Sequence, residues 1–132
     1  MTIKLNLAVV AAFLLGTVSF AQAADKPTDP QIAHIAYTAG VIDIEAAKLA
    51  VEKSKTKEVV DFANSMLADH EAVNVQALDL VKKLNVTPED NDTSKALAAA
   101  AAAKRDELSK LDGAAFDKAY IDNEVAFHAT VN

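Results

Sequence analysis

The feature that most constrains this chain is a long stripe of apolar residues at helical spacing. Between residues 59 and 84, intervals of four and three alternate without a break. The stripe consists of Val59, Ala63, Met66, His70, Val73, Ala77, Leu80 and Leu84. Such spacing brings all its members to one face of an α-helix. A long helix with one apolar face needs other helices to cover that face, so the pattern predicts a helical bundle.

Three further segments have helical patterns, and no strand-like alternation competes with them. Asp29-Pro30 predicts a helix start, with Asp29 as N-cap, and this first helix runs to about Lys53. Gly40 within it would let a neighbouring helix approach closely. Thr56 is the predicted N-cap of the second helix. An alanine-rich third helix is predicted to begin at a cap of Thr93 or Ser94 and to end at Asp112-Gly113. A fourth helix then begins at Ala114 or Ala115. No capping signal precedes Asn132, so we expect an up-down bundle that is incomplete at its C-terminus.

The N-terminal segment has the three parts of a cleavable signal peptide. Lys4 supplies a positive charge, residues 5–20 form a short apolar core, and Ala21-Gln22-Ala23 offers small residues for cleavage. The competing interpretation is a membrane anchor, but a spanning helix needs about 20 strongly apolar residues. We therefore expect export to the periplasm or beyond, cleavage after Ala23, and no transmembrane span afterwards. Residues 24–132 would then form a single domain.

Composition excludes several classes of function. The chain has a formal net charge of −6, and nucleic-acid binding needs a basic surface. It has no cysteine, so disulfides, thiolate metal sites and thiol nucleophiles are all absent. No phosphate-binding glycine loop, nucleophile elbow or H-E-x-x-H motif occurs. Because no complete catalytic set is present, we expect a binding or interaction role rather than an enzyme.

Two histidines interrupt apolar helix faces and suggest a metal site. His70 lies in the stripe of the second helix, and Glu124 and His128 are spaced by four on the last helix. The first helix has an apolar stripe of its own, made of Ile32, Ile35, Ala39, Ile42, Ala46 and Leu49. Glu45 lies one step off this stripe and could turn inward. We predict that Glu45, His70, Glu124 and His128 converge on a transition-metal ion, with Met66 and Asp69 as additional candidates. Imidazole and carboxylate ligands suit Zn, Fe, Mn or Cu, and Met66 would favour copper.

Two alternatives use the same residues without a metal. His70 and His128 could pair with Glu45, Glu124 or Tyr120 in a buried polar network, because an unpaired buried polar group costs about 1–3 kcal/mol. The chain could also be a non-catalytic interaction module. Its apolar stripe would then pair with a second copy or with another protein. His34 lies off the stripe of the first helix and is expected at the surface.

Several motifs together resemble the DUF4142 family of exported bacterial proteins. They are Gly40–Ala50, Val59–Ala63 followed by Met66-Leu-Ala-Asp69-His70, then Gly113-Ala-Ala-Phe116-Asp117-x-x-Tyr120, and His128. The resemblance implies a ferritin-like helical bundle, an unknown biochemical function and a last helix that continues past His128. Di-iron sites of ferritin-like proteins use Glu-x-x-His on two helices. Leu67 stands three residues before His70 here, so the spacing does not support a ferroxidase.

Overall fold

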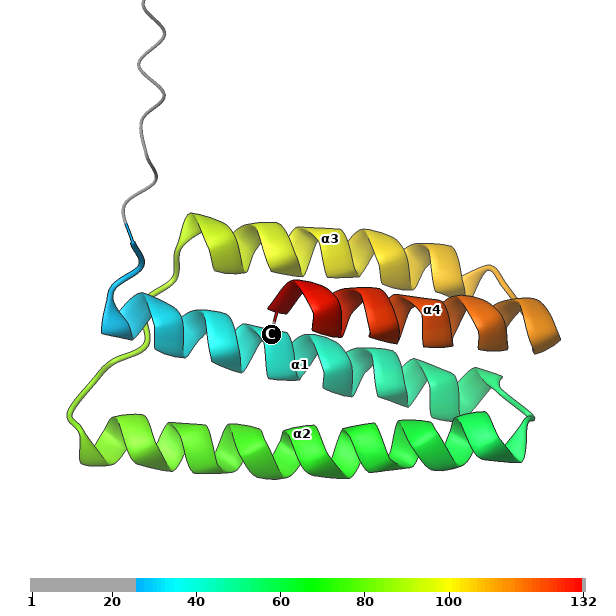
Figure 1. Ribbon diagram of the computed structural model, residues 1–132, viewed down its shortest axis with the longest axis horizontal. Helices are drawn as coiled ribbons and strands as arrows, with labels where there is room; N and C mark the ends of the chain where they lie inside the picture. Colours follow the sequence, from blue (N-terminus) through cyan, green and yellow to red (C-terminus); the bar gives the residue numbers. More distant parts are fainter. Residues whose placement is uncertain (1–25, 132) are drawn as a thin grey trace, which may run out of the picture.

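The computed structural model describes residues 26–131, which form four α-helices and no strand. They are α1 (Asp29–Lys53), α2 (Lys57–Lys83), α3 (Asp92–Ser109) and α4 (Gly113–Val131). Successive helices run in opposite directions, as Figure 1 shows. The predicted all-α, up-down bundle is therefore confirmed. The predicted signal peptide, residues 1–23, lies outside the described residues. Between residues 26 and 131, no helix is both long and apolar enough to cross a membrane.

The helix ends follow the sequence signals to within a few residues. Thr56 is the N-cap of α2, as predicted. The N-cap of α1 is Thr28 rather than Asp29, and its backbone N–H donates to the side chain of Gln31. For α3, the predicted caps were two to three residues too late. The cap is Asn91, which accepts a hydrogen bond from the Ser94 backbone N–H at 3.0 Å. An asparagine cap and a serine three residues on satisfy each other's backbone groups, which fixes this start.

Helix α1 is the central element, because α2, α3 and α4 all pack against it. In Figure 1, α1 lies between α2 on one side and α3 with α4 on the other. Small residues on α1 permit this close packing, and larger side chains from the other helices fill the core. The buried core consists of Ala46, Ala47, Ala50, Val59, Ala63, Leu108, Phe116 and Tyr120. The ring of Tyr120 stacks on Phe116 and meets Phe62 edge-on, each at a centroid distance of 6.2 Å.

The apolar stripe predicted for α2 is only half buried. Its first half packs into the core through Val59 and Ala63. In its second half, Val73, Leu80 and Leu84 are each more than half exposed. The side chain that turns inward there is Asn74, which the stripe did not include. The face shifts because α2 packs chiefly on α1, while α4 ends about halfway along α1 (Figure 1).

Gly40 marks the close approach that the sequence predicted. It is buried, and a Cβ added at this position would lie 2.2 Å from Oδ1 of Asn74. Only a residue without a side chain fits against that amide. The contact lies on α1 three residues before Asp43 and on α2 four residues after His70. The spacing of the two helices at these positions therefore depends on Gly40.

Candidate metal centre

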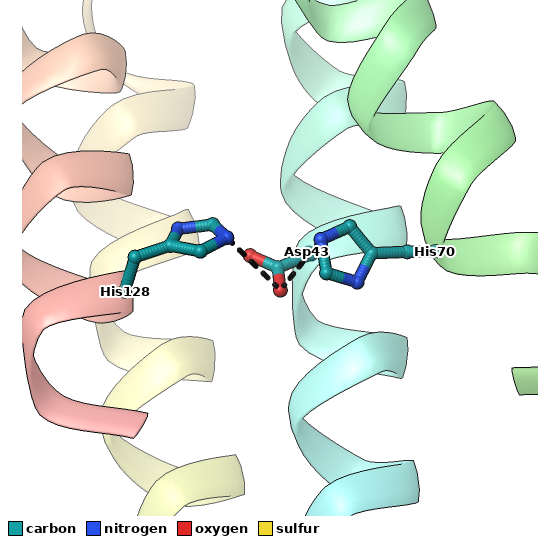
Figure 2. A group of neighbouring side chains, drawn as sticks. All are labelled: Asp43, His70 and His128. Atoms are coloured by element: carbon teal, nitrogen blue, oxygen red, sulfur yellow. Dashed lines mark ion pairs between the residues drawn. The ribbon is translucent and has the colours of Figure 1, made fainter. Parts of the chain in front are cut away.

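Asp43, His70 and His128 come together from three helices. Asp43 projects from α1, His70 from α2 and His128 from α4, and Figure 2 shows the two imidazoles on either side of the carboxylate. Each offers one potential ligand atom, and these atoms all lie within 4.8 Å of one another. The Nε2 atoms of His70 and His128 lie 3.4 Å and 4.0 Å from Oδ2 of Asp43. The imidazole ring centroids are 5.8 Å apart.

The backbone fixes which ring nitrogen of His128 faces the carboxylate. Nδ1 of His128 lies 2.9 Å from the carbonyl oxygen of Glu124, one turn earlier on α4. A carbonyl only accepts, so Nδ1 carries the proton and donates it. In the neutral imidazole, Nε2 then has a free lone pair that faces the Asp43 carboxylate. Two electron-rich atoms in that arrangement call for a cation between them, either a proton or a metal ion. Metal-binding histidines commonly use their second nitrogen in this way.

Two carboxyl groups are buried at this site. Asp43 is 2% exposed and Glu124 is 3% exposed. Burial and the Asp43 carboxylate together raise the pKa of Glu124 to about 7, while His128 opposes the shift. Burial also raises the pKa of Asp43, against the lowering effects of His70, His128 and the Glu124 carboxyl group. Both shifts mean that an ionised carboxylate is disfavoured at this site unless a positive charge accompanies it.

Three buried oxygens here have no hydrogen-bond partner among residues 26–131. They are Oδ1 of Asp43, Oε2 of Glu124 and the hydroxyl of Tyr120. Burial, Glu124 and Asp43 together raise the pKa of the Tyr120 hydroxyl, so it stays protonated. Buried polar atoms are almost always paired. A pocket with unpaired carboxylate oxygens beside two imidazoles is suited to a bound cation.

The chain matches the model of a domain of unknown function, DUF4142, over residues 16–132. This chain belongs to the DUF4142 family. The resemblance in its sequence motifs is thereby confirmed, although the family's description assigns no activity. No solved structure matches the chain.

One curated protein is similar to part of this DUF4142 chain. Over 57 residues it is 42% identical to the acyl carrier protein of Azobacteroides pseudotrichonymphae genomovar. CFP2, and the match covers 43% of this chain and 67% of that protein. Asp43 and His128 are farther apart in the sequence than the matched stretch is long. The similarity therefore cannot include all three residues of the cluster.

Of the six residues that the sequence predicted for the site, four lie in this region of the DUF4142 protein and two do not. His70 and His128 form the cluster with Asp43, and Glu124 is buried next to Asp43. Glu45 is exposed and forms an ion pair with Arg105 of α3, so the structure does not bring it to the histidines. Asp69 is also exposed on α2. Glu45 does not turn inward as expected. It lies two residues after Asp43, and residues two positions apart on a helix point to nearly opposite sides.

Asp43 is the site residue that the sequence reasoning missed. The spacing of this residue along the first helix nevertheless carried a signal. Asp43 lies four residues after Ala39 and four before Ala47, on the face that packs inward. Met66, the additional candidate, is half-buried and lines a groove with Phe62, Glu124 and His128. His34 is half-buried on α1, where it contacts Thr38.

Proposed function

We propose that this protein binds one divalent transition-metal ion through Asp43, His70 and His128, with Glu124 as the adjacent carboxylate. The observation that carries the proposal is the convergence of three ligand atoms from three helices within 4.8 Å. A buried carboxylate between two imidazoles otherwise requires protonation to balance its charge. A cation would also satisfy the unpartnered oxygens of Asp43 and Glu124.

The ligand types narrow the choice of ion. Two imidazoles and a carboxylate suit Zn²⁺, Fe²⁺, Mn²⁺ or Cu²⁺, whereas Ca²⁺ and Mg²⁺ prefer oxygen ligands alone. Met66 lines the groove that also touches His128, and its thioether would add a soft ligand for copper. We assign the protein a role in binding or sensing metal rather than in turnover.

We place this role in the bacterial envelope. The support is the three-part leader of residues 1–23, which is typical of export. An exported protein meets metal ions without the cytosolic thiol pool, and this chain has no cysteine of its own. A site of imidazoles and carboxylates is chemically suited to that compartment, because these ligands, unlike thiolates, do not form disulfides.

Metal content and affinity test the proposal directly. The protein is stripped with a chelator and then titrated with Zn²⁺ or Co²⁺. The expected result is one ion per chain, with a Co²⁺ absorption spectrum that reports nitrogen and oxygen ligands. We expect His70→Ala and His128→Ala each to weaken binding at least tenfold, because each variant removes a direct ligand.

The third histidine provides a matched control. His34→Ala makes the same substitution outside the cluster and should leave affinity unchanged. Glu45→Gln should also bind as the parent does, because its partner is Arg105. Circular dichroism of every variant confirms that the helices form. If folded His70→Ala and His128→Ala proteins retain the parental affinity, the proposed site is wrong.

A second candidate function, protein interaction, is favoured by the apolar surface of α2. Five large apolar side chains in the second half of α2 are exposed: Val73, Val75, Leu78, Leu80 and Leu84. Some of them line a groove of about 370 Å³ with Ile32 and Tyr37 of α1. Exposed apolar patches commonly mark interfaces. Light scattering tests this function, since a monomer at every concentration, with or without metal, would contradict self-association.

A further inference from the structure

A third hollow, a cleft distinct from the two grooves described above, lies between α3 and α4 and is also lined by residues of α1. Its volume is about 240 Å³, and most of its lining is apolar. The lining includes Ile42, Leu97, Ala100, Ala101, Leu108 and Phe127. Neither Asp43 nor either histidine of the cluster borders it. A ligand of this cleft would therefore not touch the three proposed metal ligands directly.

The composition of α3 explains why the space is open. Leu97 and Leu108 fill the space near either end of α3, but between them Ala100 and Ala101 contribute only methyl groups. The facing side chain of Phe127 on α4 is half-buried and does not close the gap. An unfilled apolar space of this size forfeits packing energy. A flexible apolar ligand would recover that energy.

The charged residues of the cleft are both basic. Lys104 and Arg105 line it about one turn after the alanines, and no acidic residue does. Each has an acidic partner outside the lining: Lys104 pairs with Glu107 at 2.6 Å, and Arg105 pairs with Glu45. A guanidinium has five N–H donors and an ammonium three, so both retain free donors. The remaining polar groups of the lining are Asn123 and Thr130, and the Thr130 hydroxyl donates to the Ala126 carbonyl.

We propose that this cleft binds a free single-chain carboxylate, a medium-chain fatty acid. The acyl chain would lie against Ala100, Ala101 and Phe127, and the carboxylate would meet Lys104 and Arg105. Lys104 and Arg105, in a lining without an acidic residue, provide the charge complementarity. Drug-sized ligands need pockets of about 300–1,000 Å³. The smaller cleft here suits one acyl chain rather than a two-chain lipid.

Chain length gives a test that needs no variant. Calorimetric titration of the protein in EDTA uses the carboxylates from hexanoate to dodecanoate, each below its micelle concentration. Each methylene buried in the cleft should tighten binding about fourfold, until the cleft is full. The matched alcohol, 1-decanol, should bind at least tenfold more weakly than decanoate because it cannot pair with the basic residues.

Two leucine substitutions on α3 test where the fatty acid binds. Ala101→Leu fills the cleft and should weaken decanoate binding at least tenfold. Ala102→Leu makes the same change at an exposed neighbour on α3 and should leave binding unchanged. Affinity that does not depend on chain length, or equal effects of the two variants, would overturn the proposal. So would decanoate that fails to bind while phospholipid vesicles do, because the occupant would then be a membrane surface.

Discussion

Glu124 makes folding stability depend on pH in a direction that can be calculated. Burial raises its pKa from 4.5 to about 7 in the folded protein, with a further contribution from Asp43. Between these values the folded chain holds a proton that the unfolded chain releases. Stability therefore falls as pH rises through this window, because the native state binds more protons than the unfolded state. Below pH 4.5 both states are protonated, and above pH 7 both are ionised.

The size of the effect follows from the pKa shift. One pKa unit corresponds to about 1.36 kcal/mol, so the shift of Glu124 costs the folded state about 3 kcal/mol at pH 8. Domains of this size have a total stability of about 5–15 kcal/mol. Glu124 alone would then remove a substantial share of that total at alkaline pH when no cation is bound.

Glu124→Gln tests this reasoning because glutamine has nearly the same shape and stays neutral. We expect the metal-free variant to match the parent at pH 4.5 and to exceed it by about 3 kcal/mol at pH 8. Urea unfolding followed by circular dichroism, with EDTA present, measures the difference at intervals of pH. Some pH dependence should remain, because burial also raises the pKa of Asp43.

Asp122→Asn is the matched control on α4. Asp122 is exposed and forms an ion pair with Lys118 one turn earlier. Its loss should change stability little at any pH. The reasoning is refuted if the stability difference between Glu124→Gln and the parent is the same at pH 4.5 and pH 8.

Two further predictions concern the contact of α1 with α2. Gly40→Ala should lower the melting temperature by about 4 °C or more. A Cβ 2.2 Å from the Asn74 amide belongs at the upper end of the about 1–3 kcal/mol that overpacking costs, and helix propensity returns only about 1 kcal/mol. Adding Asn74→Ala should restore most of the loss, and a melting temperature of Gly40→Ala at or above the parent's would contradict the close approach. Zn²⁺ at about 1,000 times the parental dissociation constant should stabilise the parent by about 4 kcal/mol in thermal unfolding. At the same Zn²⁺ concentration His70→Ala, which binds at least tenfold more weakly, should gain at least about 1.4 kcal/mol less.

The helices were predictable from sequence because their signals are local. Pro30, Thr56 and Gly113 mark helix boundaries at or next to the predicted residues. The start of α3 was missed because two plausible caps, Thr93 and Ser94, follow the true one. The error is small, since Ser94 still takes part in the cap through its hydroxyl, which hydrogen-bonds with the Asn91 backbone N–H.

The site was harder to predict because it depends on helix phase and on which helices meet. His70 and His128 were recognisable as polar residues on apolar faces. Choosing between Asp43 and Glu45 required knowing which side of α1 faces α2 and α4, and the apolar run around them masked the spacing of Asp43 from Ala39 and Ala47. The same limit applies to Leu80: helical spacing identifies an apolar stripe, but it does not say whether another helix covers it.

The arrangement of α2 connects these observations. α2 packs mainly on α1, and Phe62 against Tyr120 is one of its few contacts with α4. Across the remaining gap, His70 on α2 and His128 on α4 face the same carboxylate of α1. A metal ion there would join α2 to α4 at the level where their apolar contact ends. The buried carboxyl groups destabilise the metal-free bundle when they are ionised, as the raised pKa of Glu124 indicates. The same groups would stabilise a bundle that holds a metal ion. A polar network built only for stability would not leave its acceptors unpaired, and this difference favours a cation over a purely structural role for the site.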